Sequence, residues 1–137
     1  IPQRITVKGT LRTMSEEVRA NAKKRIFEIC EGTAALYGGT AAINYRDGYP
    51  VLVNTADEVA QAAAVAQSVS GAYVESPKVM GAEDFSYMLR ERPGAFISLG
   101  TGEGAPLHHP EMDFNDEAIP LGCSWFAEMV ERRMPAR

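Results

Sequence analysis

The spacing of apolar residues changes along this chain between the two-residue repeat of a strand and the three-to-four-residue repeat of a helix. The order of these segments restricts the fold more than any other feature. Ile5, Val7 and Leu11 alternate with mostly polar residues, which is typical of a half-buried β-strand, and 40–54 resumes that pattern. Between them, from Thr13 to Leu36, the apolar residues recur at the spacing of a single helix face, and helix-like patterns return at 55–70 and 115–133. Strands that alternate with helices predict an α/β fold.

Local signals place the ends of these elements. Thr13 with Glu16, and Thr55 with Glu58, have the spacing of capping boxes, which predicts that a helix starts at each pair. Gly38-Gly39 and Gly71 are expected to end the first two helices in left-handed backbone. A short helix is predicted in 83–92 and a buried strand in 95–100. Four residues form the expected buried face of each later helix: Val59, Ala62, Ala66 and Val69 in one, and Ile119, Cys123, Phe126 and Val130 in the other.

Charge and composition exclude several classes of function. Fourteen basic and eighteen acidic residues give a net charge of -4 without a basic block, so we expect no nucleic-acid partner. No apolar run approaches the roughly 20 residues that span a bilayer, so we expect no membrane role. Cys30 and Cys123 fall on expected apolar helix faces, which predicts free thiols and a reducing, cytoplasmic location.

The only histidines of the chain, His108 and His109, stand side by side between Pro106 and Pro110. Adjacent residues of an extended segment point in opposite directions, so at most one of them can face a given site. The flanking prolines stiffen the segment, which favours a metal ligand, but a histidine in a loop is more often a surface or hydrogen-bonded residue. A zinc site needs three or four ligands, and no HExxH or CxxC motif supplies the others.

Three further residues are candidates for a site. Glu83 and Asp84 precede a short helix, where carboxylates can cap free amides, and this structural interpretation competes with a functional one. Arg12 lies on an expected strand and could bind a carboxylate with two hydrogen bonds, or it could be solvated. No nucleophile elbow and no phosphate-binding loop is present.

Four motifs occur in order: GTLR at 9–12, YPVLVN at 49–54, EDF followed by PGAFISLG at 83–100, and LHHPEMDFNDEAIPLG at 107–122. With them the chain resembles the C-terminal part of the M20 metallopeptidase family, and within it the amidohydrolases that include hippurate hydrolases and auxin-conjugate hydrolases. Met112 departs from the aromatic residue usual in that family, which we interpret as a packing change.

The resemblance implies two parts of a zinc-peptidase-like α/β enzyme. Residues 1–54 would be the second half of an α+β lid domain that mediates dimerisation, and 55–137 the C-terminal segment of the catalytic domain. His108 would be a metal ligand and His109 would not. Glu83 and Asp84 would support the cleft, and Arg12 would contact the substrate carboxylate. The general base and the other ligands are expected outside this chain, so no catalytic residue is assigned here.

The function that the resemblance implies is hydrolysis of the amide bond in N-acyl amino acids, such as hippurate-like substrates. Two divalent metals would be needed per complete site, with zinc, manganese, cobalt and nickel all open. A homodimer or higher oligomer through the lid is expected, and the chain alone is expected to be an inactive C-terminal fragment. The alternative is that the isolated chain is a non-catalytic binding or dimerisation module.

Overall fold

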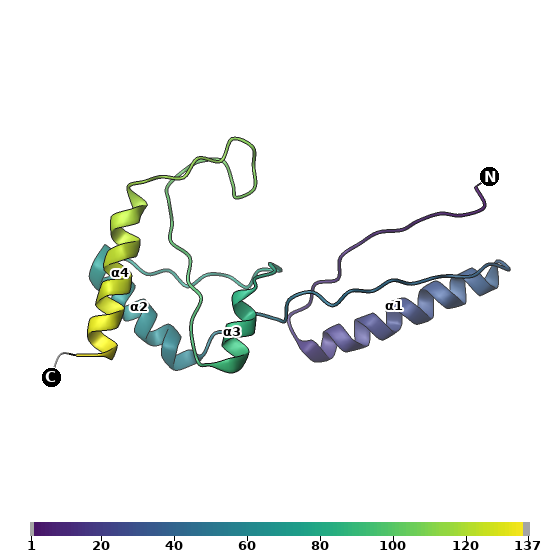
Figure 1. Cartoon of the computed structure of the whole chain (residues 1–137), viewed down its shortest axis with the longest axis horizontal. Coiled ribbons are helices and arrows are strands. Elements are labelled where there is room, and N and C mark those ends of the chain that lie inside the picture. The colour runs from purple at the N-terminus through teal and green to yellow at the C-terminus, as the bar shows by residue number, and fades with distance from the viewer. Residues whose placement is uncertain (1, 136–137) are drawn as a thin grey trace. The chain divides into compact units, whose positions relative to one another are not determined.

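The computed structural model describes residues 2–135, and its regular secondary structure is helical (Figure 1). Four helices follow one another: α1 (Glu16–Leu36), α2 (Ala56–Ser70), α3 (Phe85–Glu91) and α4 (Ala118–Arg133). Their positions agree with the helical periods of the sequence. Within the described residues, none of these helices is both long enough and apolar enough to cross a membrane.

The expected strands do not form. Residues 3–13, 40–54 and 95–100 run as uncoiled chain without a strand ladder anywhere in 2–135. A strand is stabilised by backbone hydrogen bonds to a neighbouring strand, and an isolated pair of strands is marginal in water. The irregular segment that follows α1 contacts the surface of that helix. A helix surface presents side chains, whereas strand pairing needs the free backbone groups of a neighbouring strand. The strand predictions are therefore wrong for this structure, and the α/β class is not confirmed.

The chain divides into two compact units. Unit 1 contains the residues up to Val53 together with Lys78–Arg90, and unit 2 contains Asn54–Pro77 together with the residues from Glu91 onward. Unit 1 thus holds α1 and most of α3, whereas unit 2 holds α2 and α4. The expected lid and catalytic segments, 1–54 and 55–137, remain a prediction about domains, since a compact unit is not by itself a domain.

In unit 1, α1 begins with a cap that differs from the expected one. Ser15 has extended backbone and its hydroxyl accepts a hydrogen bond from the amide of Val18. Thr13 instead donates its hydroxyl to the Ser15 carbonyl, and the Glu16 carboxylate accepts from the amide of Val51 at 3.0 Å. The cap of α1 is therefore Ser15, two residues after the Thr13 that the capping box predicts. The Glu16 carboxylate binds the distant Val51 amide and not an amide at the start of the helix.

The uncoiled residues 40–53, here called the return segment, run back along α1. Arg19 donates to the carbonyls of Gly48 and Tyr49 at 3.0 Å each, and its side chain is only 15% exposed. One helical turn further on, Lys23 pairs with Asp47 at 3.0 Å and lies over the Tyr45 ring. Polar side chains of α1 therefore satisfy backbone carbonyls that strand pairing would otherwise satisfy.

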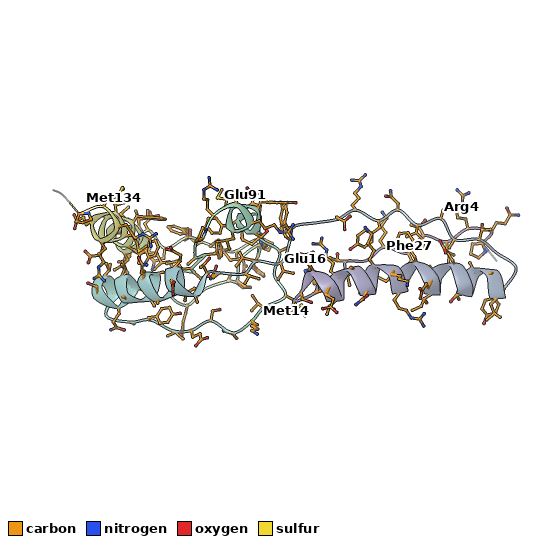
Figure 2. The ribbon with its side chains drawn as sticks, turned by 90° about the horizontal axis from the view of Figure 1, so that it is seen from below. Arg4, Met14, Glu16, Phe27, Glu91 and Met134 are labelled. Carbon is orange, nitrogen blue, oxygen red and sulfur yellow. The ribbon has the colours of Figure 1, made fainter. Side chains whose placement is uncertain are left out.

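Aromatic contacts complete unit 1. Phe27 packs against Tyr45 with 6.3 Å between ring centroids, and Figure 2 shows Phe27 on the face of α1 that is turned toward uncoiled chain. Tyr87 of α3 meets Tyr49 edge to face at 5.9 Å. No residue of α1 is buried, so α1 has only a shallow apolar contact with its surroundings.

In unit 2, α2 and α4 pack side by side (Figure 1). The contact buries small side chains, namely Ala62 and Val65 of α2, while Ala118 is buried at the start of α4. Trp125 donates its indole N–H to the Ala62 carbonyl at 3.2 Å. At the other end of the pair, Arg133 donates to both Glu58 and Gln61. Glu58 is thus an ion-pair partner, and the side chain of Thr55 makes no cap hydrogen bond, so the second capping box is also wrong.

Two features of the helix faces correct the sequence-based expectation. The apolar face of α4 is exposed: Phe126 is 68% and Val130 51% accessible, and Cys123 is exposed as well. Cys30 on α1 is likewise exposed. Within the described residues, the hydrogen bonds of α4 with α2 come from Trp125 and Arg133, whereas Cys123, Phe126 and Val130 remain exposed.

The helix ends with glycine are confirmed. Gly71 caps α2 with φ 74°, and Gly38 follows the cap of α1 with φ 73°. Both conformations are left-handed, where the lack of a Cβ removes the steric cost. The sequence predicts these helix ends because a glycine cap acts only on the few residues next to it.

Candidate functional site

Both histidines lie in a loop of unit 2, residues 102–114, here called the histidine loop. The loop begins after Thr101 and ends before Asn115. The side-chain amide of Asn115 donates a hydrogen bond to the Thr101 carbonyl at 3.1 Å. In Figure 1 the chain before α4, in light green, turns back so that its two arms run together. The amide oxygen of Asn115 accepts from the Glu117 amide at 3.0 Å, directly before α4. The loop is therefore closed at its base and continuous with a helix.

His108 has an unusual backbone. Its φ of 68° makes it the single non-glycine residue with positive φ among the described residues. The amide of His109 donates to the Pro106 carbonyl at 3.0 Å, so 106–109 form a tight turn with His108 as its third residue. Left-handed backbone is unfavourable for a residue with a Cβ, although histidine tolerates it better than most. His108 is exposed, so its imidazole is accessible to a ligand.

His109 has a different environment. Its Nδ1 accepts a hydrogen bond from the Glu111 amide at 3.2 Å, and its carbonyl accepts from the Met112 amide at 3.0 Å. An accepting Nδ1 leaves the proton of a neutral imidazole on Nε2. The two adjacent histidines therefore differ, because His109 stabilises the loop whereas His108 makes no side-chain hydrogen bond within 2–135.

The histidine loop contains side chains that can bind a metal, but they do not form a metal site. No three side chains among His, Cys, Asp and Glu come together in the described part of the chain. A structural or catalytic zinc needs at least three protein ligands. The described residues therefore do not fit a complete divalent-metal centre, and His108 could serve only as one ligand of a larger set.

The chain that leads into the loop is held in place by Asn54 and Thr55. The side-chain amide of Asn54 pairs with both backbone groups of Phe96, donating to its carbonyl at 3.0 Å and accepting from its amide at 2.8 Å. The Thr55 hydroxyl accepts from the Gly94 amide at 3.3 Å, and the Thr55 amide donates to the Gly94 carbonyl at 2.9 Å. The partner of Asn54 lies 42 positions away along the chain, so the local sequence does not reveal this contact.

The other expected site residues lie in unit 1. Arg12 is exposed, and no carboxylate of the described residues pairs with it. Glu83 is half-buried and Asp84 is exposed; their backbone carbonyls accept hydrogen bonds from Ser86 and Tyr87 at the start of α3. Neither carboxylate caps an α3 amide in the described structure, so the capping interpretation of this pair is wrong. No contact joins Arg12 to Glu83 or Asp84 there.

Unit 1 also contains a hollow of 380 Å³ that combines charged and aromatic side chains. Its charged residues pair with one another: Glu16 meets Arg90 at 3.0 Å and Arg19 at 3.6 Å. The hydrogen bond from the Val51 amide, assisted by the two arginines and opposed by partial desolvation, lowers the pKa of Glu16. A hydrogen bond to Tyr45 raises the pKa of Arg19. This cluster satisfies itself and holds the return segment, so it serves the fold and offers no unpaired group to a ligand.

Comparison with known proteins gives the family. The model of peptidase family M20/M25/M40 matches residues 4–132. Thermostable carboxypeptidase 2 of Saccharolobus solfataricus is 32% identical over 90% of this chain and 33% of its own length. N-acetyldiaminopimelate deacetylase of Streptococcus thermophilus is 33% identical over 96% and 35%, respectively.

A plant relative gives the same result. IAA-amino acid hydrolase ILR1-like 2 of Arabidopsis thaliana is 34% identical over 95% of this chain and 31% of its own length. The chain thus spans about a third of the length of the curated relatives that it matches. No solved structure matches it. The match confirms the resemblance carried by the four motifs, and the chain belongs to peptidase family M20/M25/M40.

Proposed function

We propose that this chain is part of a metal-dependent amidohydrolase that cleaves the amide bond of N-acyl amino acids. The names of its relatives support this reaction, since they include N-acetylcysteine deacetylase of Bacillus subtilis, N-acetyldiaminopimelate deacetylase and IAA-amino acid hydrolase. Each of these names describes the removal of an acyl group from an amino acid or the hydrolysis of an amino-acid conjugate. Hippurate, an aromatic acyl group on glycine, belongs to the same chemical class.

The observation that carries the proposal is the backbone of His108. His108 carries a Cβ and is held in left-handed backbone, which is unfavourable outside glycine, and its exposed side chain makes no hydrogen bond in the described residues. Such outliers concentrate at ligand-binding positions. We propose that His108 is one ligand of a divalent metal whose other ligands come from residues outside this chain. The metal, which could be zinc, manganese, cobalt or nickel, would acidify water and polarise the scissile carbonyl.

The test is a pair of substitutions in the amidohydrolase that carries this chain. We expect His108→Ala to weaken the binding of one Zn²⁺ per active site by more than the roughly 10–100-fold typical of an outer-shell partner, with most activity lost. His109→Ala is the matched control and should change Zn²⁺ affinity far less, because its Nδ1 is engaged with the Glu111 amide. Equal losses of Zn²⁺ in the two variants would refute the assignment.

Three residues of unit 1 are proposed for supporting roles. Arg12 would bind the substrate carboxylate, which is consistent with an exposed guanidinium that is not engaged by a carboxylate in 2–135. Glu83 and Asp84 would support the cleft, since their carboxylates are not used as caps of α3. Cytoplasmic location and assembly into a homodimer or higher oligomer through residues 1–54 complete the proposal.

A second function is favoured by one observation. Because the described residues hold no group of three metal donors, the chain by itself could act as a non-catalytic binding or dimerisation module. Zn²⁺ titration of the 137-residue chain distinguishes the two cases. Stoichiometric tight binding together with amide hydrolysis by the chain alone would exclude the second function.

A further inference from the structure

We infer that Asn115 is a positioning residue for His108, because its side chain closes the base of the histidine loop and so holds the turn that presents the imidazole. The inference rests on the proposed function, since the position of His108 matters for metal binding only if His108 is a ligand. It concerns residues of unit 2 only.

Asn115 uses both halves of its amide at the base of the loop. Its Nδ2 donates to the Thr101 carbonyl at 3.1 Å, and its Oδ1 accepts from the Glu117 amide at 3.0 Å. The first bond joins the two arms of the loop, and the second fixes Asn115 to the start of α4. A single side chain therefore links the loop to a helix of the unit.

Both arms of the loop begin from anchored chain. Upstream, Asn54 holds Phe96 on the chain before α2, and a Cβ placed on Gly122 of α4 would lie 3.5 Å from the side chain of Leu99. Downstream, Ala118 is buried at the start of α4. The bond between Asn115 and Thr101 therefore joins the two arms where each leaves the anchored part of the unit, and its loss would let the arms separate there.

Inside the loop the hydrogen bonds are local. They join Pro106 to His109, His109 to Met112, and the His109 ring to Glu111. Within the described residues, no other hydrogen bond or ion pair connects 102–114 to the rest of unit 2. The turn around His108 thus has an ordered shape of its own, but its placement on the unit depends on the bond made by Asn115.

Gly102 supports the same geometry from the opposite arm. Its φ is 92°, and an added Cβ would lie 4.0 Å from Asn115 Nδ2, in ordinary van der Waals contact. A side chain fits in the space but strains the backbone. Gly104 offers a matched control, because it has no positive φ and no atom within 4 Å of an added Cβ.

The substitutions separate positioning from helix capping. Asn115→Asp keeps the acceptor for the Glu117 amide and adds a favourable charge near the N-terminus of α4, but it removes the donor to Thr101. Asn115→Ala removes both bonds. Gly102→Ala strains the base of the loop without touching the cap.

Two measurements apply to these variants. The first is amide hydrogen exchange in the amidohydrolase that carries the chain: Asn115→Asp should make the amides of Leu107–Met112 exchange faster, while α4 keeps its protection. The second is Zn²⁺ binding to the amidohydrolase that carries the chain, where Asn115→Asp and Gly102→Ala should raise the dissociation constant about tenfold. Gly104→Ala should change neither.

Four results would overturn the inference. Three of them are unchanged loop order in Asn115→Asp, unchanged Zn²⁺ affinity in that variant, and a wild-type loop that is already as mobile as the loop of the variant. The fourth is a loss of α4 protection in Asn115→Asp equal to that in Asn115→Ala, which would make Asn115 only a helix cap. The two proposals fail separately. Retained Zn²⁺ affinity in His108→Ala with a loosened Asn115→Asp loop refutes the proposed function, whereas normal order in Asn115→Asp with Zn²⁺ loss in His108→Ala refutes this inference alone.

Discussion

At the scale of single residues, backbone conformation separates two neighbours that the sequence leaves equivalent. The residues themselves indicated that only one of His108 and His109 could face a site, and the family resemblance selected His108. The structure adds a physical difference between them: His108 has positive φ, whereas the ring of His109 accepts a hydrogen bond from Glu111. The sequence does not reveal either feature, because the backbone angles of a turn depend on all four of its residues together.

Substitution by glycine turns this difference into a measurement. Glycine at 108 relieves roughly 1–2 kcal/mol of left-handed strain, against about 0.5–1 kcal/mol of added entropy in the unfolded chain, so we expect His108→Gly to leave the free energy of unfolding unchanged or to raise it by up to about 1 kcal/mol. His109→Gly loses a hydrogen bond and relieves no strain, so it should cost about 1 kcal/mol. Chemical denaturation of the two variants checks this, and a larger loss in His108→Gly would contradict it.

At the scale of elements, helices were predictable and their partners were not. The four helical segments and the glycine ends of α1 and α2 follow from local residue spacing. Both capping boxes failed because Glu16 and Glu58 bind partners far away in the sequence, Val51 and Arg133. The strands failed for the same reason, since a ladder needs a second segment that no local pattern specifies. Likewise, periodicity identified the apolar face of α4 but not the side that would be covered.

The contact between α1 and the return segment should depend on pH through Glu16. Its pKa in the folded chain lies below its ordinary value of 4.5, chiefly because the carboxylate accepts from the Val51 amide. The stabilisation is therefore complete above that value and is lost as the pH falls through the lower folded pKa. We expect the protection factor of the Val51 amide to fall in the wild type as the pH drops below 4.5, which amide exchange corrected for its intrinsic pH dependence would show.

Two variants control for other titrating groups. Glu16→Gln should exchange faster at neutral pH and lose the acid-dependent step at Val51. Glu17→Gln, at the next position of the same helix turn, should behave like the wild type, because in 2–135 its carboxylate binds no part of the return segment. A wild-type Val51 amide whose protection does not change with acid would disprove the link.

At the scale of the whole molecule, the apolar surface is large and the core is small. Among the described residues the buried apolar side chains are Pro50, Ala62, Val65 and Ala118, whereas Val7 is 87% and Leu36 77% exposed. The composition is 45% apolar, and composition counts apolar residues without saying what covers them. The family is clear from ordered motifs, because those depend on residue identity and not on packing.

The isolated chain should therefore unfold with low cooperativity. We expect a denaturant slope at or below the lower end of the 1–3 kcal/mol/M range for urea, strong binding of an apolar dye, and association that increases with concentration. Urea titration, dye fluorescence and sedimentation measure these properties. A monodisperse monomer with a steep transition and no dye binding would show that the exposed apolar side chains are covered in solution.

The closed base of the histidine loop has a consequence for protein engineering. Since the Asn115 side chain binds the Thr101 carbonyl, the two ends of 102–114 are held near each other, as an inserted loop requires. Closing a longer loop between fixed ends costs only about 0.6 kcal/mol for each doubling of its length. A foreign recognition loop that keeps Gly102 and Asn115 could therefore be grafted here, with α4 retained as its support.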